Sequence, residues 1–329
     1  MKKISWRWIT IAVAVIVVAL TFTGWLLDKE PDTFSVKARV EQDLQQQQLT
    51  YVTGYATTTS LINVLETMLN KRGGYLSNDV LPPMIFMDNM PAWEYGVLEM
   101  SRDLALVMRN DFSRSQSQST QNPLLTKAQP ALNIDNTSWI APTAEDEYQS
   151  AIEALQEYRL ALADPNDYSA QFYSRADNLR SWLAEVEKRL GSLSQRLSAS
   201  VARVQVNTDL AGDSQAKQST KSPALSVQQT SWWQIDNVFY ESRGAAWALL
   251  HFLKGVEIDF ADVLEDKNAL VSLRQIIREL EATQATVWSP MVLNGSGFGM
   301  LANHSLVMAN YLSRANAAVI DLRSLLSQG

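Results

Sequence analysis

The chain contains two histidines, the side chains whose ordinary pKa best suits proton transfer near neutral pH. His251 lies between Leu250 and Phe252 in an aromatic-rich stretch, and His304 lies on the apolar stripe of the last expected helix. Neither belongs to a His-x-x-x-His or His-Glu-x-x-His spacing, which a histidine-based metal site needs. We therefore interpret both as core histidines with one or two satisfied hydrogen bonds, and we predict no metal and no cofactor.

A Ser-x-x-Lys string, the spacing of one class of serine enzymes, occurs at Ser214 to Lys217. It falls within the polar stretch from Asn207 to Thr230, which is rich in Asp, Ser, Gln and Lys. A serine nucleophile and a lysine base need a rigid, partly desolvated pocket. We therefore interpret the string as part of a flexible linker between two helical regions.

Carboxylates offer a second route to an enzyme, because a pair of them can act as general acid and general base. Charged residues that flank helices are usually solvated or form simple ion pairs. An envelope hydrolase that uses carboxylates around the aromatic helix, residues 236–262, is therefore the alternative hypothesis and not the leading one. The carboxylates concerned are Asp236, Glu241, Asp259 and Asp262, and a further one, Asp111, lies near Arg102, Arg109 and Arg114.

The string Asn294-Gly-Ser-Gly-Phe-Gly299 precedes the last expected helix and could present backbone N–H groups to an anion. It lacks the lysine of a phosphate-binding P-loop, and Met300 stands where a dinucleotide-binding fingerprint needs its third glycine. We interpret residues 295–299 as a tight turn that lets two helices pack closely.

The first element of the chain is an apolar run of membrane-spanning length, from Ile9 to Leu27. It contains no charge, and about 20 apolar residues in a helix cross the hydrocarbon core of a bilayer. No Ala-x-Ala-like cleavage site follows Leu20, so an uncleaved anchor is favoured over a signal peptide. Trp6, Trp8 and Trp25 stand where interfacial aromatic rings belong.

Charges on the two sides of this run predict its orientation. By the positive-inside rule, residues 1–8 lie in the cytoplasm and the bulk of the chain lies in the periplasm of a bacterial inner-membrane protein. The charges are Lys2, Lys3 and Arg7 before the run, and Asp28, Glu30 and Asp32 after it, with Lys29 among them.

Composition bounds the rest of the chain. The formal net charge is -7, which argues against nucleic acid as a partner, because phosphate neutralisation needs basic surfaces. There is no cysteine, so disulfides, thiolate metal sites and thiol nucleophiles are excluded. The chain has 329 residues but only 13 glycines and 10 prolines, which favours long helices over a turn-rich β architecture.

The strongest periodic signal lies between residues 172 and 204, where apolar residues recur in alternating steps of four and three. Such a narrow seam is typical of a coiled-coil-like helix with one or two partners. The preceding helix, which follows Pro142, is the expected antiparallel partner, so we predict a long hairpin over 142–206. The seam consists of Phe172, Ala176, Leu179, Leu183, Val186, Leu190, Leu193, Leu197 and Val204.

These patterns together predict an all-α protein: a single transmembrane helix followed by an elongated helical bundle. Residues 113–142 are expected to form a loosely packed connection. The expected divisions are a cytoplasmic head (1–8), a transmembrane anchor (9–27), a helical region (28–206), a polar linker (207–230) and a C-terminal helical region (231–329) that packs on the first.

A weak internal repeat has an offset of 148 residues. Asp88-Asn89, Gly96 and Asp111-Phe112 recur as Asp236-Asn237, Gly244 and Asp259-Phe260, which makes five identities over 25 ungapped positions. In the same register, Pro142 matches Pro290. We take this as the hypothesis of two duplicated helical modules, which requires that the two segments have similar helix boundaries and neighbours.

Four strings carry a resemblance to a known family. They are Asp88-Asn-Met-Pro-Ala-Trp-Glu-Tyr-Gly96, Asp111-Phe-Ser-Arg-Ser-Gln-Ser-Gln-Ser119, Asp236-Asn-Val-Phe-Tyr-Glu-Ser-Arg-Gly-Ala-Ala-Trp247, and Asn294-Gly-Ser-Gly-Phe-Gly299 with Ala302-Asn-His-Ser305.

Across nearly its whole length, the chain resembles an uncharacterised bacterial family of membrane-anchored proteins classed as a domain of unknown function. The resemblance implies a bacterial inner-membrane protein of Gram-negative type, and it brings no catalytic residues with it. We therefore take as candidate site residues, without an assigned role, Asp88, Trp93, Asp111, Arg114, Asp236, Arg243, His251, Asp259, Asn303 and His304.

The leading hypothesis is a non-enzymatic protein, tethered to the inner membrane, whose periplasmic helical domain binds or scaffolds other envelope proteins. The long seam, the polar linkers and the lack of a recognisable catalytic constellation favour it. Its expected partners are the lipid bilayer, through residues 9–27, and other envelope proteins, but not nucleic acid.

Overall fold

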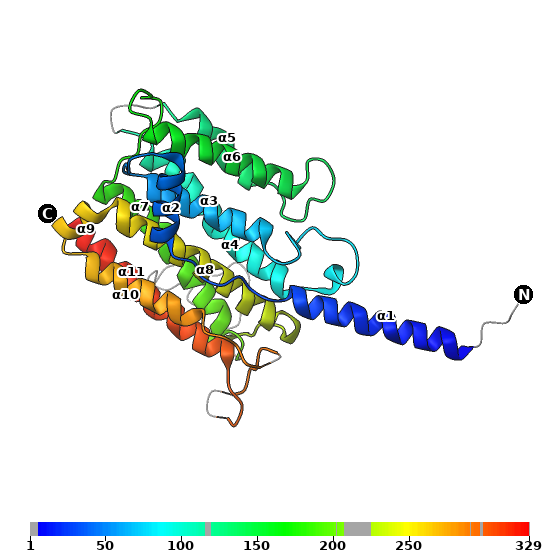
Figure 1. The fold of residues 1–329 in the computed structure, drawn as a ribbon. Helices are drawn as coiled ribbons and strands as arrows, with labels where there is room; N and C mark the ends of the chain where they lie inside the picture. Colours follow the sequence, from blue (N-terminus) through cyan, green and yellow to red (C-terminus); the bar gives the residue numbers. More distant parts are fainter. Residues whose placement is uncertain are drawn as a thin grey trace, which may run out of the picture.

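The fold is all-α, as the sequence predicts. In the computed structural model, residues 6–115, 120–201, 203–206, 225–289, 291–296 and 299–328 are described. Figure 1 shows one helix, α1 (Trp6–Leu27), projecting from a thick helical body. Of the described helices, only α1 is long and apolar enough to cross a membrane, with a mean hydropathy of 2.4. Its three threonines donate to backbone carbonyls four residues earlier, so their hydroxyls need no other partner.

Two helices that run in the same direction, α4 and α8, cross at the centre of the body. A Cβ atom on Gly96 would lie 2.0 Å from the carbonyl oxygen of Glu241, and one on Gly244 would lie 2.0 Å from that of Trp93. Only glycine permits such an approach, so the two helix backbones touch. The bounds are Asn89–Val107 for α4 and Ile235–Asp259 for α8.

The predicted repeat is confirmed, because residues 148 positions apart have equivalent contacts and equivalent helix boundaries around this crossing. Gly96 and Gly244 are equivalent at the offset of 148, and so are their contacts Trp93 and Glu241, which makes the crossing two-fold symmetric. A short 3₁₀ turn precedes each helix at equivalent positions, η1 (Met84–Phe86) and η3 (Trp232–Gln234). At the far end, the rings of the equivalent Phe112 and Phe260 lie 5.4 Å apart. Pro290, the last residue of the repeat, lies outside the described residues.

Each central helix is the core of a four-helix module. In the first module, α5 and α6 pack as a pair, and α3 packs on α6; in the second, α10 and α11 pack as a pair, and α7 packs on α11. Figure 1 places the two pairs on opposite sides of α4 and α8. The helices are α3 (Tyr55–Asn70), α5 (Pro123–Leu132), α6 (Ala144–Ala163), α7 (Ala176–Ser198), α10 (Leu270–Thr283) and α11 (His304–Ser327).

The expected hairpin over 142–206 is wrong in its pairing. The seam of α7 is buried as predicted, from Leu179 to Leu197, but its partner is α11 and not α6. α6 instead buries Tyr148 and Tyr158 with α5 and α3. A repeat of apolar residues identifies the buried face of a helix but carries no information about which helix covers it.

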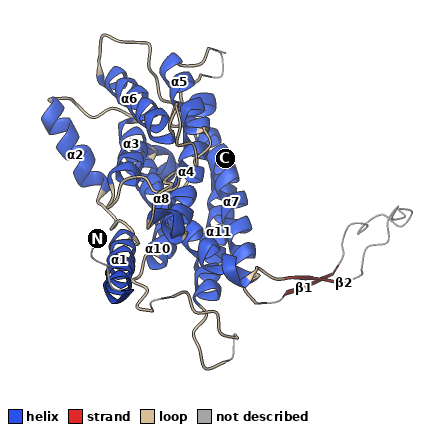
Figure 2. Cartoon of the chain, turned by 90° about the vertical axis from the view of Figure 1, so that its right-hand side faces the viewer, coloured by secondary structure: helices blue, strands red, loops and turns tan. Residues whose placement is uncertain are grey.

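Two boundaries also differ from the expectation. The segment 113–142 contains a packed helix, α5, which begins at Pro123 with Asn122 as its N-cap and buries Leu125 and Leu132. α7 ends at Ser198, so Val204, the last residue of the expected seam, lies in a strand. That strand, β1 (Arg203–Val206), pairs antiparallel with β2 (Leu225–Gln228), and Figure 2 shows the pair projecting from the body. The string Ser214 to Lys217 lies outside the described residues.

Two short helices complete the described structure. α2 (Val36–Gln47) begins at Ser35, whose hydroxyl accepts the N–H of Ala38, and it packs through Val36 and Val40 on the outside of α3 and α8. α9 (Ala261–Asp266) continues from the end of α8. The segment of residues 28–35, which joins α1 to α2, lies across the body, and we call it the strap.

Candidate functional site

The strap is fixed to α8 by a buried aromatic cluster. Phe34 stacks on His251 with ring centroids 3.9 Å apart and meets Trp247 edge-on at 5.8 Å, and the guanidinium of Arg39 lies 3.9 Å above its ring. The N–H of Phe34 donates to Nε2 of His251 at 3.1 Å, and Nδ1 of the same ring lies 2.7 Å from the carbonyl oxygen of Trp247. His251 therefore carries its proton on Nδ1 and is neutral.

Burial lowers the pKa of His251 to about 4. Because both ring nitrogens already have protein partners, the ring is not available to a substrate. The interpretation of His251 as a core histidine with satisfied hydrogen bonds is thus confirmed. The aromatic neighbours Trp247 and Trp93, 5.2 Å apart, extend the cluster to the α4–α8 crossing, so Trp93 is a packing residue.

A buried ion pair holds the part of the strap nearest to α1. The guanidinium of Arg243 donates to the carboxylate of Glu30, at 2.5 to 2.9 Å, and also to the carbonyl oxygens of Thr283 and Ala285. Both charged side chains are largely buried. A paired, fully hydrogen-bonded arginine of this kind links three segments, namely the strap, α8 and the end of α10.

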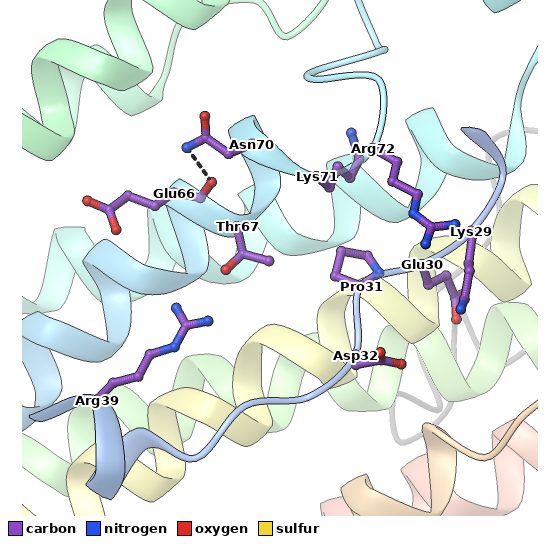
Figure 3. A pocket seen from close by; sticks show the side chains of 10 residues that line it. All are labelled: Lys29, Glu30, Pro31, Asp32, Arg39, Glu66, Thr67, Asn70, Lys71 and Arg72. Atoms are coloured by element: carbon purple, nitrogen blue, oxygen red, sulfur yellow. Dashed lines mark hydrogen bonds between the residues drawn. The ribbon is translucent and has the colours of Figure 1, made fainter. Parts of the chain in front are cut away.

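Open pockets lie on both sides of the strap near the end of α1. One, of about 430 Å³, lies between the strap and α3, and Figure 3 shows the side chains of Lys29, Glu30 and Arg72 together at one end of it. The other, of about 300 Å³, lies between the strap and the segment after α10. Their linings contain charges of both signs and few apolar side chains, so neither has the character of a small-molecule site. The first pocket is lined by Lys29, Glu30, Pro31, Asp32, Arg39, Glu66, Thr67, Asn70, Lys71 and Arg72.

A larger groove, of about 930 Å³, begins at the end of the strap and lies between α2 and the helices α8 to α10. Its floor is apolar, and its rim carries charges of both signs, including the ion pairs Lys37–Glu41 and Arg274–Glu257. We call it the α2 groove. Its apolar lining residues are Phe34, Val36, Val40, Leu44, Tyr51, Ile258, Ala261 and Leu270.

Asp259 has a structural role that its charge did not indicate. One oxygen of its carboxylate accepts the N–H of Gly54 and the hydroxyl of Tyr51, both at 2.7 Å, and the other accepts the N–H of Thr57 at 2.6 Å. The carboxylate therefore caps the N-terminus of α3 from the end of α8. Burial raises the pKa of Asp259, while these hydrogen bonds oppose that shift.

Asp88 and Asp236 lie near each other at the N-terminal ends of α4 and α8, beside Asp28 at the end of α1. Burial raises the pKa of Asp88, and its proximity to Asp236 adds to the shift. Asn89 donates to the carboxylate of Asp28 at 3.1 Å. Nowhere in the described residues do three or more His, Asp or Glu side chains form a group that could hold a metal ion.

The other candidates are dispersed. Asp111 lies in the π-helical turn after α4, where its backbone oxygen accepts from Asn178; burial raises the pKa of its carboxyl group, and the charges of Arg114 and Arg175 oppose that shift. Asn303 caps α11 by accepting the N–H of Leu306 and donates to the carbonyl oxygen of Gly295. Of the tight turn predicted at 295–299, residues 297 and 298 lie outside the described residues.

His304 is not the core histidine that the sequence predicts. It begins α11 and is half-buried instead of lying in the core, and its Nδ1 accepts the N–H of Leu293 at 3.1 Å. The buried stripe of α11 contains Met308, Leu312, Ala315 and Val319 and packs against α7 and α10.

A family model for uncharacterized proteins conserved in bacteria (DUF2333) matches residues 1–329. The chain belongs to this family. The match includes α1, so the apolar helix is part of the family pattern and not an addition to this chain. No curated protein and no solved structure matches the chain.

The carboxylates of the hydrolase alternative do not meet in this member of the family. Asp236 and Asp259 lie at opposite ends of α8, which at 1.5 Å per residue separates them by about 35 Å. Glu241 forms an ion pair with Arg196, and Asp262 begins α9 at the surface. Asp236 and Asp259 therefore cannot act on one substrate together.

Sequence reasoning missed the most deeply buried ion pair. Glu94, fully buried in α4, accepts from the ammonium of Lys71 and from the N–H groups of Leu76 and Ser77 at 2.8 Å. It fastens the segment after α3 onto α4. A lone glutamate in an amphipathic helix gives no signal of this, because the partner lies 23 residues earlier in a loop.

Proposed function

We propose that the protein is a non-enzymatic, single-pass inner-membrane protein whose helical domain lies in the periplasm and binds a second envelope protein in the α2 groove. The observation that carries the proposal is the groove itself, about 930 Å³ in volume, whose lining includes the partly exposed apolar side chains of Leu44, Ile258 and Leu270. Apolar grooves between helices are typical sites for an amphipathic helix or an extended peptide.

The charges of the rim indicate the character of the occupant. Both walls carry charges of both signs: Lys37 and Glu41 line the groove from α2, and Lys254, Glu257 and Glu265 line it from α8 and α9. The expected occupant is therefore an amphipathic segment with apolar residues along one face and charges of both signs beside them.

The proposed membrane topology is supported by α1 and by the charges around it, and the family match supports a bacterial protein. α1 continues into the strap, whose Phe34 and Glu30 are part of the packed body. Basic residues precede the helix and acidic residues follow it, which favours a cytoplasmic N-terminus and a periplasmic domain.

Site-specific photo-crosslinking in living cells tests this function. A photoreactive amino acid replaces Leu44 or Leu270, which line the groove and are partly exposed, in the full-length chain. The control position is Tyr168, which is 82% exposed in the connection between α6 and α7. We expect one discrete adduct at both groove positions, with the same envelope protein identified by mass spectrometry, and none at Tyr168.

A charge in the groove sharpens the test. With the probe at Leu270, the substitution Leu44→Asp is expected to reduce the adduct about tenfold, since it places a carboxylate on the apolar floor. Gln45→Asp adds the same charge at the neighbouring exposed position of α2 and is expected to leave the adduct unchanged. Equal yields at the groove positions and at Tyr168 would contradict the proposed function.

A further inference from the structure

Large apolar side chains are exposed on four loops of the helical body. Two of the loops precede the central helices and contain the 3₁₀ turns η1 and η3, and the other two connect α5 to α6 and α10 to α11. The side chains most exposed on them are Leu81 and Phe86, Trp232 and Trp233, Trp139 and Ile140, and Trp288 and Met300.

All four loops lie at the end of the body where α1 joins it. Pro83 is the nearest contact of Gly24 in the last turn of α1, and Leu27 packs against Gly73. The α5–α6 loop is held to the same end, because Asn78 donates to the carbonyl oxygen of Ser138. The loop after α10 is held there by the bonds of Arg243, which also binds Glu30 of the strap. Figure 1 shows the loops around the exit of α1, and Figure 2 looks nearly along α1 at this end.

Outside α1, the exposed tryptophans are all found at the end of the body where α1 joins it. Of the ten tryptophans in the chain, three flank or lie in α1, and three, Trp93, Trp182 and Trp247, are fully buried. The remaining four are all on the loops around α1 and are 56% to 92% exposed. Elsewhere on the described body, the large apolar side chains more than 60% exposed are Tyr168 and Val271.

We propose that these four loops form a lipid-binding face by which the helical domain rests on the outer surface of the bilayer that α1 spans. The continuity with α1 selects the occupant: Pro83 lies beside Gly24, one residue before the interfacial Trp25, so the loop that carries Phe86 is at the depth of the headgroups. Tryptophan is enriched at that depth because its ring is apolar and its N–H bonds to water or to headgroups.

The charges on the same face are compatible with headgroups. Lys29 and Arg72 line the pocket beside the strap near the end of α1, where they can meet lipid phosphate (Figure 3). Burial raises the pKa of Asp28 and of Asp88, which lowers the cost of placing these carboxylates at the membrane surface. The face thus combines apolar side chains on its loops with polar groups around the strap.

Because the chain has no cysteine, single cysteines carrying an environment-sensitive dye can test the face in the full chain. The protein is reconstituted in vesicles of phosphatidylethanolamine and phosphatidylglycerol, and dye emission and its quenching by nitroxide-labelled lipids are measured. One variant is made for each loop, with two exposed controls on the rest of the body: Phe86→Cys, Trp233→Cys, Ile140→Cys and Met300→Cys, against Tyr168→Cys and Val271→Cys.

We expect blue-shifted emission for all four loop positions, stronger quenching by nitroxides near the headgroup than by those at the chain end, and aqueous emission for both controls. The inference rests on α1 as the anchor, and flotation with the vesicles checks that separately. If the protein floats but the loop dyes emit like the controls, the face does not bind lipid. A blue shift that fades as the protein-to-lipid ratio falls would also overturn the inference, because it would show a contact between two copies of the chain.

Discussion

The two modules share the crossing of α4 and α8, but the equivalent aspartates at the C-terminal ends of these helices have different roles. Asp111 and Asp259 are equivalent by the repeat, yet only Asp259 is buried and caps another helix. Asp111 contributes its backbone oxygen to Asn178, and its carboxylate is partly exposed. The glycines and phenylalanines of the repeat, in contrast, have the same contacts in both modules. Residue identity between the modules therefore reports shared packing of the backbones and does not identify a pair of functional groups.

The largest expected effect is at the symmetric crossing. Gly96→Ala and Gly244→Ala each place a methyl group about 2 Å from a backbone oxygen of the facing helix, so the helices must separate. We expect each to lower the free energy of unfolding by about 4 kcal/mol or more, as measured by urea denaturation. Gly191→Ala in α7, where the nearest atom is 3.6 Å away, is the control and is expected to be neutral or stabilising. Clearly different losses of unfolding free energy for the two variants would contradict the two-fold symmetry of the crossing.

The next effect separates the two aspartates. Asp259→Ala leaves two buried N–H groups at the start of α3 without an acceptor, which we expect to cost about 3 kcal/mol of unfolding free energy. Asp111→Ala removes a partly exposed carboxylate and is expected to cost under about 0.5 kcal/mol. Similar losses for the two variants in urea denaturation would mean that Asp111 has a buried role like that of Asp259.

A pH-dependent difference is expected at His251, whose equivalent in the first module is Asp103, paired with Arg189 at 2.7 Å. The pKa of His251 is lowered from 6.5 to about 4 by burial, so the folded state binds fewer protons than the unfolded state between these values. This contribution to stability is present above pH 6.5 and is lost as the pH falls towards 4, by up to about 3 kcal/mol.

The measurement at this site is the unfolding free energy as a function of pH for the native chain and for His251→Gln. The difference between their slopes isolates the histidine from the buried carboxylates, whose raised pKa values act in the opposite direction. Asp103→Asn is the matched variant of the first module, because it changes the equivalent side chain and leaves His251 in place. A His251→Gln variant with an unchanged slope would show that the ring is protonated without unfolding.

The smallest expected effect on stability is at the equivalent positions Ile85 and Trp233, both exposed. Ile85→Gln and Trp233→Gln should each change the unfolding free energy by less than about 0.5 kcal/mol. Both should nevertheless reduce the blue shift of a dye at Phe86→Cys in vesicles. A large loss of stability at either position would place that side chain in the core of its module.

The sequence predicts the fold class, the anchor, the seam of α7 and the repeat, because each depends on local periodicity or on a direct identity between segments. It does not predict that α11 covers α7, since several helices offer a suitable apolar face. It also misses α5, because Pro123, Pro130 and the polar residues before them hide the short stripe from Leu125 to Leu132.

The site was less predictable than the fold. His251 was correctly interpreted from its apolar neighbours, but its partner Phe34 lies 217 residues away, so the docking of the strap has no local signal. The roles of Asp259, Arg243 and Glu94 likewise depend on backbone groups of distant segments. The α2 groove is formed by what α2 leaves uncovered, and no residue pattern encodes an absence of contacts.

The central claim is that α1 anchors a helical domain on the periplasmic side of the inner membrane, and cysteine labelling in cells tests it most directly. A maleimide that does not cross the inner membrane is applied to cells with a permeabilised outer membrane, which express full-length Tyr168→Cys or Lys3→Cys. We predict that Tyr168→Cys is labelled in these cells and that Lys3→Cys is labelled only after lysis. Labelling of Tyr168→Cys only after lysis would contradict the account.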